Sequence, residues 1–487
     1  MTDHAVVIAG GGPTGLMLAA ELRLAGIDVA IVERRSSGQQ YGSPAGGLHS
    51  RTLEVLDQRG IADRFLAEGK AMQIQSFAGI PLDISDFPTR HNYGLALGQR
   101  HTERILAAWA DELGVPIARE REVTGFVEDA TGVDVELSGD RLLRAAYLVG
   151  CDGGRSVVRK AAGIEFAGQD ATTSWLMAEV EMTEKPVLGV HPEGGGIGYV
   201  NPAEGRGPVG VVLTEKEIEH TREPTLMDVR EALVAAYGTD FGAHSPTTIS
   251  RFTDVTRQAV SYRRGRALLA GDAAQVRPPQ GGQGLNTGVQ DAVNLGWKLA
   301  QVVNGTSADD LLDTYHSERH PVGARVQRYS LAQTALRRTD ERTKALRDAM
   351  VEVLRMDEPR KHLAGAMSGL DIHYALGDGH PLVGRRMPDL DLVTAGGPLR
   401  LFTLLHAARP VFLNLGGRTG FDLEPWATRV ELVDASYDGR WELPVLGEVA
   451  APAAVLIRPD GYVAWAGELT DPRLTGALTR WFGRPAG

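Results

Sequence analysis

The sequence predicts a mixed α/β (α+β) fold, and three features near its start carry that prediction. The apolar run 5–9 is followed directly by the glycine-rich segment Gly10-Gly11-Gly12-Pro13-Thr14-Gly15. A second apolar run, 29–32, ends at Glu33, which lies 23 residues after Gly10. The residues between the two runs that recur at helical spacing are Leu16, Ala19, Leu22 and Ala25. These features predict a Rossmann-like strand–helix–strand unit.

This unit predicts that the chain binds a dinucleotide. Glycines permit the tight turn from strand to helix and let backbone N–H groups approach a pyrophosphate at the helix N-terminus. Glu33 can accept hydrogen bonds from both hydroxyls of the adenosine ribose. Arg34 and Arg35 would suit a 2′-phosphate, but the carboxylate of Glu33 would repel that phosphate, so NADP is the minor option here. The motif by itself does not separate NAD, NADP and FAD.

Two later apolar runs end in similar polar turns. The run 266–270 ends in Gly271-Asp272, where a strand-end carboxylate is placed to meet a ribose-like chain. The run 147–150 breaks into Cys151-Asp152-Gly153. Three dinucleotide-type motifs therefore follow one another in order.

In that order and spacing the motifs resemble the single-component FAD-dependent aromatic monooxygenases of the para-hydroxybenzoate hydroxylase type. Two segments are nearly identical to sequence motifs of that family: 279–286, PQGGQGLN, and 290–299, QDAVNLGWKL. The likeness is greatest to the aromatic polyketide hydroxylases of angucycline, anthracycline and tetracycline tailoring, and to rifampicin monooxygenase. It runs nearly from end to end of the chain.

The resemblance implies an FAD-binding domain of the glutathione-reductase type. FAD would be held by the glycine-rich segment and Glu33, with Asp272 on its ribityl chain and Gln99 contacting the flavin. Asp152 and Gly153 would serve both FAD and the reducing nucleotide, NADPH or NADH. The expected cofactor-binding residues are Gly10, Gly12, Pro13, Thr14, Gly15, Glu33, Arg34, Gln99, Asp152, Gly271, Asp272, Pro279, Gly282, Gly284, Leu285 and Asn286.

The glycine-rich segment 279–286 supports this interpretation on physical grounds. A helix is expected from near Asn286 to a stop at Asn304-Gly305, preceded by Gly281, Gly282 and Gly284. A reduced isoalloxazine carries negative charge at N1 and O2. Backbone N–H groups and a helix N-terminus directed at that edge would stabilise the reduced form.

The chain departs from the family pattern at two places. Pro44 stands where relatives usually carry an arginine that contacts the cofactor, and proline can neither carry charge nor donate. After Gly271-Asp272, where many relatives show two histidines, this chain has Gln275 and Arg277. These changes leave cofactor affinity and coupling to NADPH open, and neutral drift is an equally good explanation.

The pattern along the chain suggests three parts. Residues 1–171 and 263–372 are expected to form the FAD-binding domain with a helical extension after Pro321. Residues 172–262 change to strands and are expected to form an inserted β-sheet domain that binds substrate. Residues 373–487 resemble a thioredoxin-like C-terminal domain. That domain lacks Cys-x-x-Cys, which favours a structural or association role over a redox one.

Several further elements are expected from periodicity and turn signals. The expected helices are 50–58, 102–113 and one capped by Thr225 with Asp228 three residues later. The expected strands are 123–127, 133–137, 174–182, 197–200, 208–213 and 410–415, with a hairpin joining 454–457 to 462–465.

Composition limits the functional class. The 487 residues carry a formal net charge of −11 with no basic block, so nucleic acid is not an expected partner. There is no run of eighteen apolar residues and no signal peptide, so a cytoplasmic protein without membrane attachment is expected. The single cysteine, Cys151, excludes an internal disulfide and a cysteine-based metal site, and no metal is expected. A homodimer is left open.

The resemblance implies a specific chemistry. NADPH or NADH would reduce FAD, O2 would add to give a flavin C4a-hydroperoxide, and a phenolic ring of a polycyclic aromatic polyketide or related antibiotic would attack it. The protein would exclude water and hold the ring within reach. No side chain identifies itself as the base, so the catalytic residues are left unassigned.

Two alternatives stay open. The same flavin chemistry could serve Baeyer–Villiger oxidation, epoxidation or inactivation of a rifamycin-like drug. An oxygenase-like FAD-binding protein with a structural or assembly role is the alternative from another class. Pro44 and the pair Gln275 and Arg277 are the features that suggest it.

Overall fold

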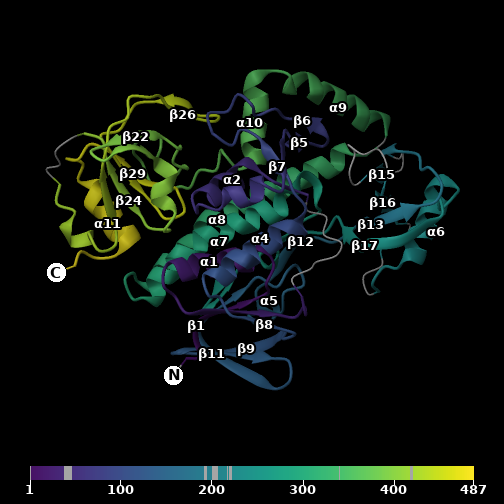
Figure 1. Ribbon diagram of the computed structural model, residues 1–487, viewed down its shortest axis with the longest axis horizontal. Helices are drawn as coiled ribbons and strands as arrows, with labels where there is room; N and C mark the ends of the chain where they lie inside the picture. Colours follow the sequence, from purple (N-terminus) through teal and green to yellow (C-terminus); the bar gives the residue numbers. More distant parts are fainter. Residues whose placement is uncertain are drawn as a thin grey trace.

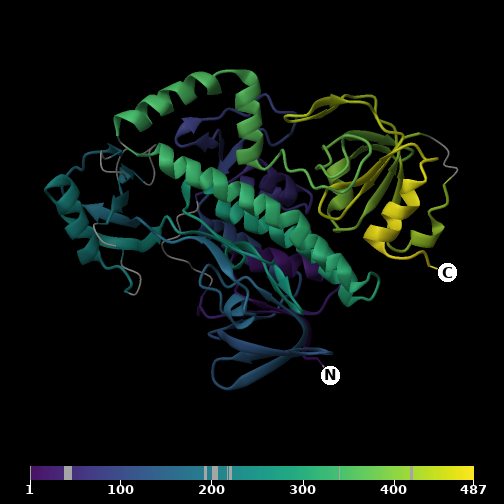
Figure 2. The same ribbon diagram turned by 180° about the vertical axis from the view of Figure 1, so that it is seen from behind.

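The computed structural model describes residues 2–37, 46–190, 195–199, 207–215, 218, 222–338, 340–416 and 421–486. Figure 1 shows a central body flanked by a β-sheet lobe on one side and a C-terminal lobe on the other, and Figure 2 shows the same order from behind. The mixed α/β class predicted from the sequence is confirmed.

The central body is built on a sheet whose principal path runs β19-β20-β11-β1-β2-β8. Parallel pairs join β1 (His4–Ala9) to β2 (Val29–Glu33) and to β11 (Arg141–Gly150), and β11 to β20 (Ala267–Leu269). Every residue of β2 is buried, as is typical of parallel strands covered on both faces. The expected strands 5–9 and 29–32 are confirmed.

Helices cover this sheet. Helix α1 (Pro13–Leu24) packs between α4 (Gln99–Glu112) and α7 (Gln283–Val303). Both α4 and α7 begin three residues before the expected Thr102 and Asn286. The polar first turns, which carry little apolar periodicity, concealed these starts.

Two antiparallel strands, β9 (Val123–Asp129) and β10 (Gly132–Leu137), extend the central sheet from β11. They confirm the expected strand pair. The smaller elements of the central body are α2 (Ser50–Asp57), α3 (Ala62–Leu66), α5 (Val157–Ala161), β3 (Gly47–Leu48), β4 (Lys70–Met72), β5 (Ser76–Phe77), β6 (Ile80–Pro81), β7 (Gly94–Ala96), β8 (Ile117–Arg119), β12 (Phe166–Gln169), β18 (Thr256–Ala259), β19 (Arg263–Arg264) and β21 (Gln275–Val276).

The β-sheet lobe is an antiparallel sheet in the order β14-β15-β16-β13-β17. Its strands are β13 (Ser174–Met182), β14 (Gly189–Val190), β15 (Gly195–Tyr199), β16 (Val209–Thr214) and β17 (Ala243–Thr253). Side chains alternate between the two faces. One face packs on α6 (Leu226–Tyr237), whose capping box between Thr225 and Asp228 is as predicted.

Helix α8 (Asp313–Leu336) runs beside α7 through the central body, and α9 (Glu341–Leu354) and α10 (Asp357–Ser368) follow it at the top of the view in Figure 1. Pro321 lies inside α8, so the helix does not start there as expected. Packing of α8 along α7 outweighs the backbone hydrogen bond that proline removes. Among the helices of the described ranges, none has both the length and the apolar character of a membrane span.

The C-terminal lobe contains a sheet in the order β25-β24-β28-β29. Its main elements are β24 (Val411–Asn414), β25 (Glu431–Asp434), β28 (Ala454–Ile457), β29 (Val463–Gly467) and α11 (Arg473–Phe482), with β22 (Asp391–Thr394), β23 (Gly397–Arg400), β26 (Trp441–Leu443) and β27 (Gly447–Val449) around them. The hairpin of β28 and β29 and the strand β24 confirm the expected pattern.

Candidate functional site

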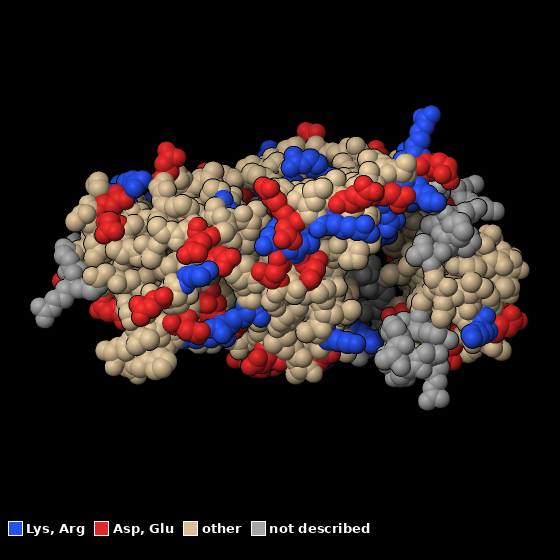
Figure 3. Space-filling model, turned by 90° about the horizontal axis from the view of Figure 1, so that it is seen from above, with Lys and Arg blue, Asp and Glu red and all other residues tan. Residues whose placement is uncertain are grey.

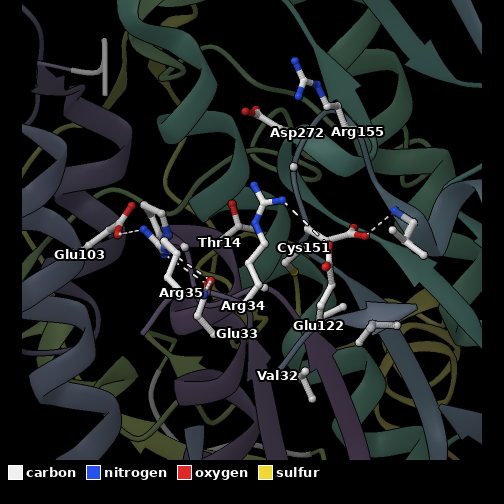
Figure 4. A pocket seen from close by; sticks show the side chains of 18 of the residues that line it. Thr14, Val32, Glu33, Arg34, Arg35, Glu103, Glu122, Cys151, Arg155 and Asp272 are labelled. Atoms are coloured by element: carbon white, nitrogen blue, oxygen red, sulfur yellow. Dashed lines mark hydrogen bonds and ion pairs between the residues drawn. The ribbon is translucent and has the colours of Figure 1, made fainter. Parts of the chain in front are cut away.

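A groove of about 380 Å³ lies where β1, β2 and β11 end, beside the N-terminus of α1. It brings together residues that are widely separated in the sequence, as Figure 4 shows. The sequence-predicted residues that line it are Gly10, Gly12, Pro13, Thr14, Glu33, Arg34, Gln99, Asp152, Asp272, Gly284 and Leu285.

Five other predicted residues lie behind the groove wall or next to it. A Cβ at Gly15 would lie 2.0 Å from the carbonyl oxygen of Gly10, so glycine lets the helix approach the strand end. Gly271 is buried, and a Cβ there would lie 2.6 Å from Oγ1 of Thr14. Asn286 accepts from the backbone N–H of His49 at 2.7 Å. Pro279 and Gly282 belong to the turn that precedes α7.

The glycines at the start of α1 have different structural tasks. Gly10 has a φ of +102°, and a Cβ there would come 2.4 Å from the carbonyl oxygen of Cys151. Gly12 is the N-cap of α1, and a Cβ there would meet nothing within 4 Å. The backbone at Gly12 is therefore open to the groove, so the helix N-terminus can approach an anion closely.

Glu33 lies at one end of the groove and is only 4% exposed. Its carboxylate accepts from the backbone N–H of Gly11 at 2.7 Å and from that of Arg35 at 2.8 Å. Burial alone would raise the pKa of Glu33, but hydrogen bonds from Arg35 and Gly11 outweigh burial and lower it. Glu33 is therefore a fixed anion at neutral pH.

Asp272 and Glu33 lie toward opposite ends of the residues drawn in Figure 4. Asp272 lines the groove and its side chain is exposed there. Desolvation by the neighbouring protein raises the pKa of Asp272, and nearby Arg277 partly offsets the rise. The two carboxylates offer hydrogen-bond acceptors at the two ends of an elongated ligand.

Asp152 also lines the groove, and its two carboxylate oxygens differ in their hydrogen bonding. Its Oδ2 accepts from the backbone N–H of Val157 at 2.7 Å and from that of Val158 at 3.2 Å. Its Oδ1 is buried and has no hydrogen-bond partner among the described residues. A buried acceptor left in this state is costly, so a donor from a bound ligand would stabilise it.

The neighbouring Cys151 also lines the groove. Burial raises the pKa of its thiol well above the ordinary value, with Asp152 and Asp291 adding to the effect. A thiol that stays protonated is a poor nucleophile.

Several groove residues were missed at the level of sequence. They are Glu103, Arg121, Glu122, Val123, Cys151, Arg155 and Val157. Arg35 and Gly153, which the sequence did indicate, line the groove as well. One signal was available: Gln99 and Glu103 are four residues apart, which places them on one face of a helix. The expected helix start at Thr102 hid that spacing.

Gln275 and Arg277, the two departures from the family pattern, form a chain of hydrogen bonds. Arg277 donates from Nη1 to Oε1 of Gln275 at 3.0 Å and from Nη2 to the backbone carbonyl of Gln283 at 3.2 Å. Gln275 in turn donates to Asp291 at 3.3 Å. Arg277 thereby holds the first turn of α7. The other departure, Pro44, lies outside the described residues.

These features fit an extended dinucleotide such as FAD. An open helix N-terminus suits a pyrophosphate, and carboxylates at both ends suit ribose and ribityl hydroxyls. The unpaired Oδ1 of Asp152 provides an independent indication that a ligand donor belongs in the groove.

Comparisons with known proteins agree with this geometry. A family model described as an FAD binding domain matches residues 3–330. A model described as the C-terminal region of aromatic-ring hydroxylases matches residues 380–485.

Individual relatives match over almost the whole chain. The 12-dehydrotetracycline 5-monooxygenase/anhydrotetracycline 6-monooxygenase of Streptomyces rimosus is 44% identical over 508 residues, covering 99% of both chains. A rifampicin monooxygenase of Streptomyces venezuelae is 42% identical over 496 residues, covering 98% of both. The solved structure of an anhydrotetracycline hydroxylase from Streptomyces rimosus superposes with a TM-score of 0.91 at 42% identity, covering 99% of this chain and 100% of that one.

Proposed function

Because the chain belongs to the FAD-dependent aromatic-ring hydroxylase family of monooxygenases, we propose that it hydroxylates a polycyclic aromatic polyketide or a related antibiotic. The resemblance inferred from the sequence is confirmed by these comparisons. NADPH or NADH would supply the electrons and O2 the transferred oxygen. The observation that carries the proposal is the groove with carboxylates at both ends and an open helix N-terminus between the strand ends.

Within this proposal the groove residues hold FAD. The N-terminus of α1 at Gly12 would bind the pyrophosphate, Glu33 the adenosine ribose and Asp272 the ribityl chain. Gln99 and the segment 279–286 would contact the flavin. When bound, FAD supplies hydride acceptance from NAD(P)H and activation of O2 for transfer to an aromatic ring.

At the flavin end of the groove, the protein's own contribution to the chemistry is electrostatic. Arg277 and the left-handed Gly281 and Gly282 set the position of the first turn of α7. Backbone N–H groups there are expected to stabilise negative charge on a reduced flavin. The remaining task of the protein is to position an aromatic substrate and exclude water.

The inner face of the β-sheet lobe offers a surface for such a substrate. On the face opposite α6, Trp175 and Phe252 pair across β13 and β17 and stack with ring centroids 5.3 Å apart at 18°. Met177 lies on the same face, two residues along β13. Figure 3 shows a hollow between this lobe, on the right, and the body of the molecule. Flat aromatic side chains suit flat polycyclic rings.

The domain division belongs to the same proposal. Residues 1–171 and 263–372 would form the FAD-binding domain of glutathione-reductase type, and residues 172–262 the substrate domain. Residues 373–487 would form a thioredoxin-like domain with a structural role. The proposal places the enzyme in the cytoplasm, where reduced nicotinamide nucleotides are available.

The test is consumption of NADPH and NADH by the FAD-loaded protein against a panel of aromatic polyketides and rifamycins, with products identified by mass under ¹⁸O2. One labelled oxygen in an aromatic product supports hydroxylation. Labelled oxygen in a lactone, an epoxide or a modified rifamycin supports the alternative flavin chemistry. The similarity to rifampicin monooxygenase makes this chemistry the second candidate. Absence of labelled product from every substrate, with FAD bound, contradicts both and favours the structural role.

A further inference from the structure

We propose that Glu103, on helix α4, is a positioning residue that sets two contacts in the cofactor groove at once, those of Gln99 and Arg35. The inference rests on the FAD site proposed above and extends it to a residue not predicted from the sequence. Glu103 lines the groove, and its side chain is only 3% exposed. Its carboxylate therefore belongs to the wall of the site.

The two carboxylate oxygens of Glu103 serve different partners. Oε1 accepts from Nε2 of Gln99 at 2.8 Å, one helical turn earlier on α4. Oε2 accepts from Nη1 of Arg35 at 3.0 Å, which comes from the segment after β2. A buried carboxylate is stable only when it is paired and hydrogen-bonded, so these two contacts hold each other in place.

The first contact determines which way the amide of Gln99 faces. A carboxylate only accepts hydrogen bonds, so Glu103 orients the amide nitrogen of Gln99 toward itself. The amide oxygen must then lie on the other side of the group. Gln99 lines the groove, so Glu103 sets the orientation of an amide in the groove wall.

The second contact, between Glu103 and Arg35, affects whether Glu33 can accept hydrogen bonds from a ligand. Arg35 donates to Glu33 from its backbone N–H and from Nη2, its Nε lies 3.2 Å from Oε1, and Gly11 adds a fourth donor. A carboxylate has about four acceptor positions, so all those of Glu33 are taken. Ribose hydroxyls must therefore displace the guanidinium of Arg35. Because Glu103 also pairs with Arg35, the displaced cation keeps a buried counter-ion.

The experiment measures FAD affinity of the apoprotein by flavin fluorescence for wild type, Glu103→Gln, Gln99→Ala and the double variant. We expect Glu103→Gln to weaken FAD binding by about tenfold or more, because an amide cannot accept from both partners. The loss in the double variant should be smaller than the product of the single losses by about threefold or more, since both changes remove one shared contact. Glu112→Gln is the matched control: Glu112 lies on the same helix in an exposed pair with Arg64 and should leave affinity within about twofold.

The outcomes separate this inference from the function on which it rests. Wild type that fails to bind FAD contradicts the proposed function. Wild type that binds FAD, with Glu103→Gln within about twofold or with single losses that simply multiply, overturns the role of Glu103. Should Glu103→Gln not fold, as its melting curve will show, the cycle of Arg35→Gln with Gln99→Ala replaces it. Multiplicative losses in that cycle overturn the proposal equally.

Discussion

Arg319 of α8 donates from Nε to Oδ1 of Asp291 of α7 at 2.6 Å, and both side chains are fully buried. The other oxygen of Asp291 accepts from the backbone N–H of Gly271 at 3.3 Å. This ion pair therefore joins two helices to the strand end that carries Asp272.

Breaking this pair should destabilise the fold. Arg319→Met leaves Asp291 as an uncompensated buried charge, for which the expected cost is about 3–5 kcal/mol. Urea unfolding of the apoprotein measures the change. Arg64→Met, which removes an exposed pair with Glu112, should cost far less because water screens that pair. Equal effects of the two changes would show that the buried pair has no special role.

Removal of the carboxylate at the ribityl end should weaken FAD binding. Asp272→Ala leaves ligand hydroxyls without acceptors, at roughly 1–3 kcal/mol, so affinity should fall about tenfold or more. Asp272→Asn keeps one acceptor oxygen and should lose less. Titration of the apoprotein with FAD measures these affinities. An unchanged affinity in Asp272→Ala contradicts the assignment of Asp272 to the ribityl chain.

Two glycine substitutions should separate cofactor binding from folding. Gly12→Ala meets no neighbour, so the stability of the apoprotein should change by less than about 0.5 kcal/mol while FAD affinity drops. Gly15→Ala would press against the carbonyl of Gly10 and should destabilise the apoprotein by about 1–3 kcal/mol. The measurements are thermal unfolding without FAD and FAD titration. Full affinity in Gly12→Ala would place the pyrophosphate elsewhere.

The contact between the C-terminal lobe and α8 should weaken at acid pH. Arg458 donates to both oxygens of Glu318, at 2.8 and 2.7 Å. Burial alone would raise the pKa of Glu318, but Arg458 and Lys298 lower it from 4.5 to about 2. A carboxyl whose pKa falls on folding stabilises the fold above its unfolded pKa, and that stability is lost as pH falls from 4.5 toward 2.

The matching experiment compares unfolding free energies of wild type and Glu318→Gln between pH 7 and pH 2. The wild type should be the more stable at pH 7, and the difference should shrink below pH 4.5. A difference that stays constant over this range would mean that Glu318 is not ionised in the folded protein.

Oxygen transfer should follow the ionisation of the substrate. An ionised phenol is a more electron-rich ring than a neutral one, and ionisation of the substrate itself can supply this activation. We expect the pH profile of single-turnover product formation to shift with the phenol pKa when two substrates of different acidity are compared. A profile that stays fixed would reveal a protein base.

Local sequence patterns were sufficient for the central elements. Continuous apolar runs identified β1 and β2, and the turn residues after them located the groove. The capping pair Thr225 and Asp228 identified the start of α6, because capping depends on residues only three positions apart. The expected start of α4 at Thr102 was three residues late, since the helix begins at Gln99 and its polar first turn carries no apolar signal.

The sequence by itself thus determined the dinucleotide-binding unit, the family and the residues at both ends of the groove. Only the tertiary structure decided how those residues are held. Glu103 meets Arg35, Arg319 meets Asp291 and Arg458 meets Glu318 across separations of 28 to 140 residues. Such partners leave no local periodicity, because buried charges are paired through the packing of whole helices and lobes.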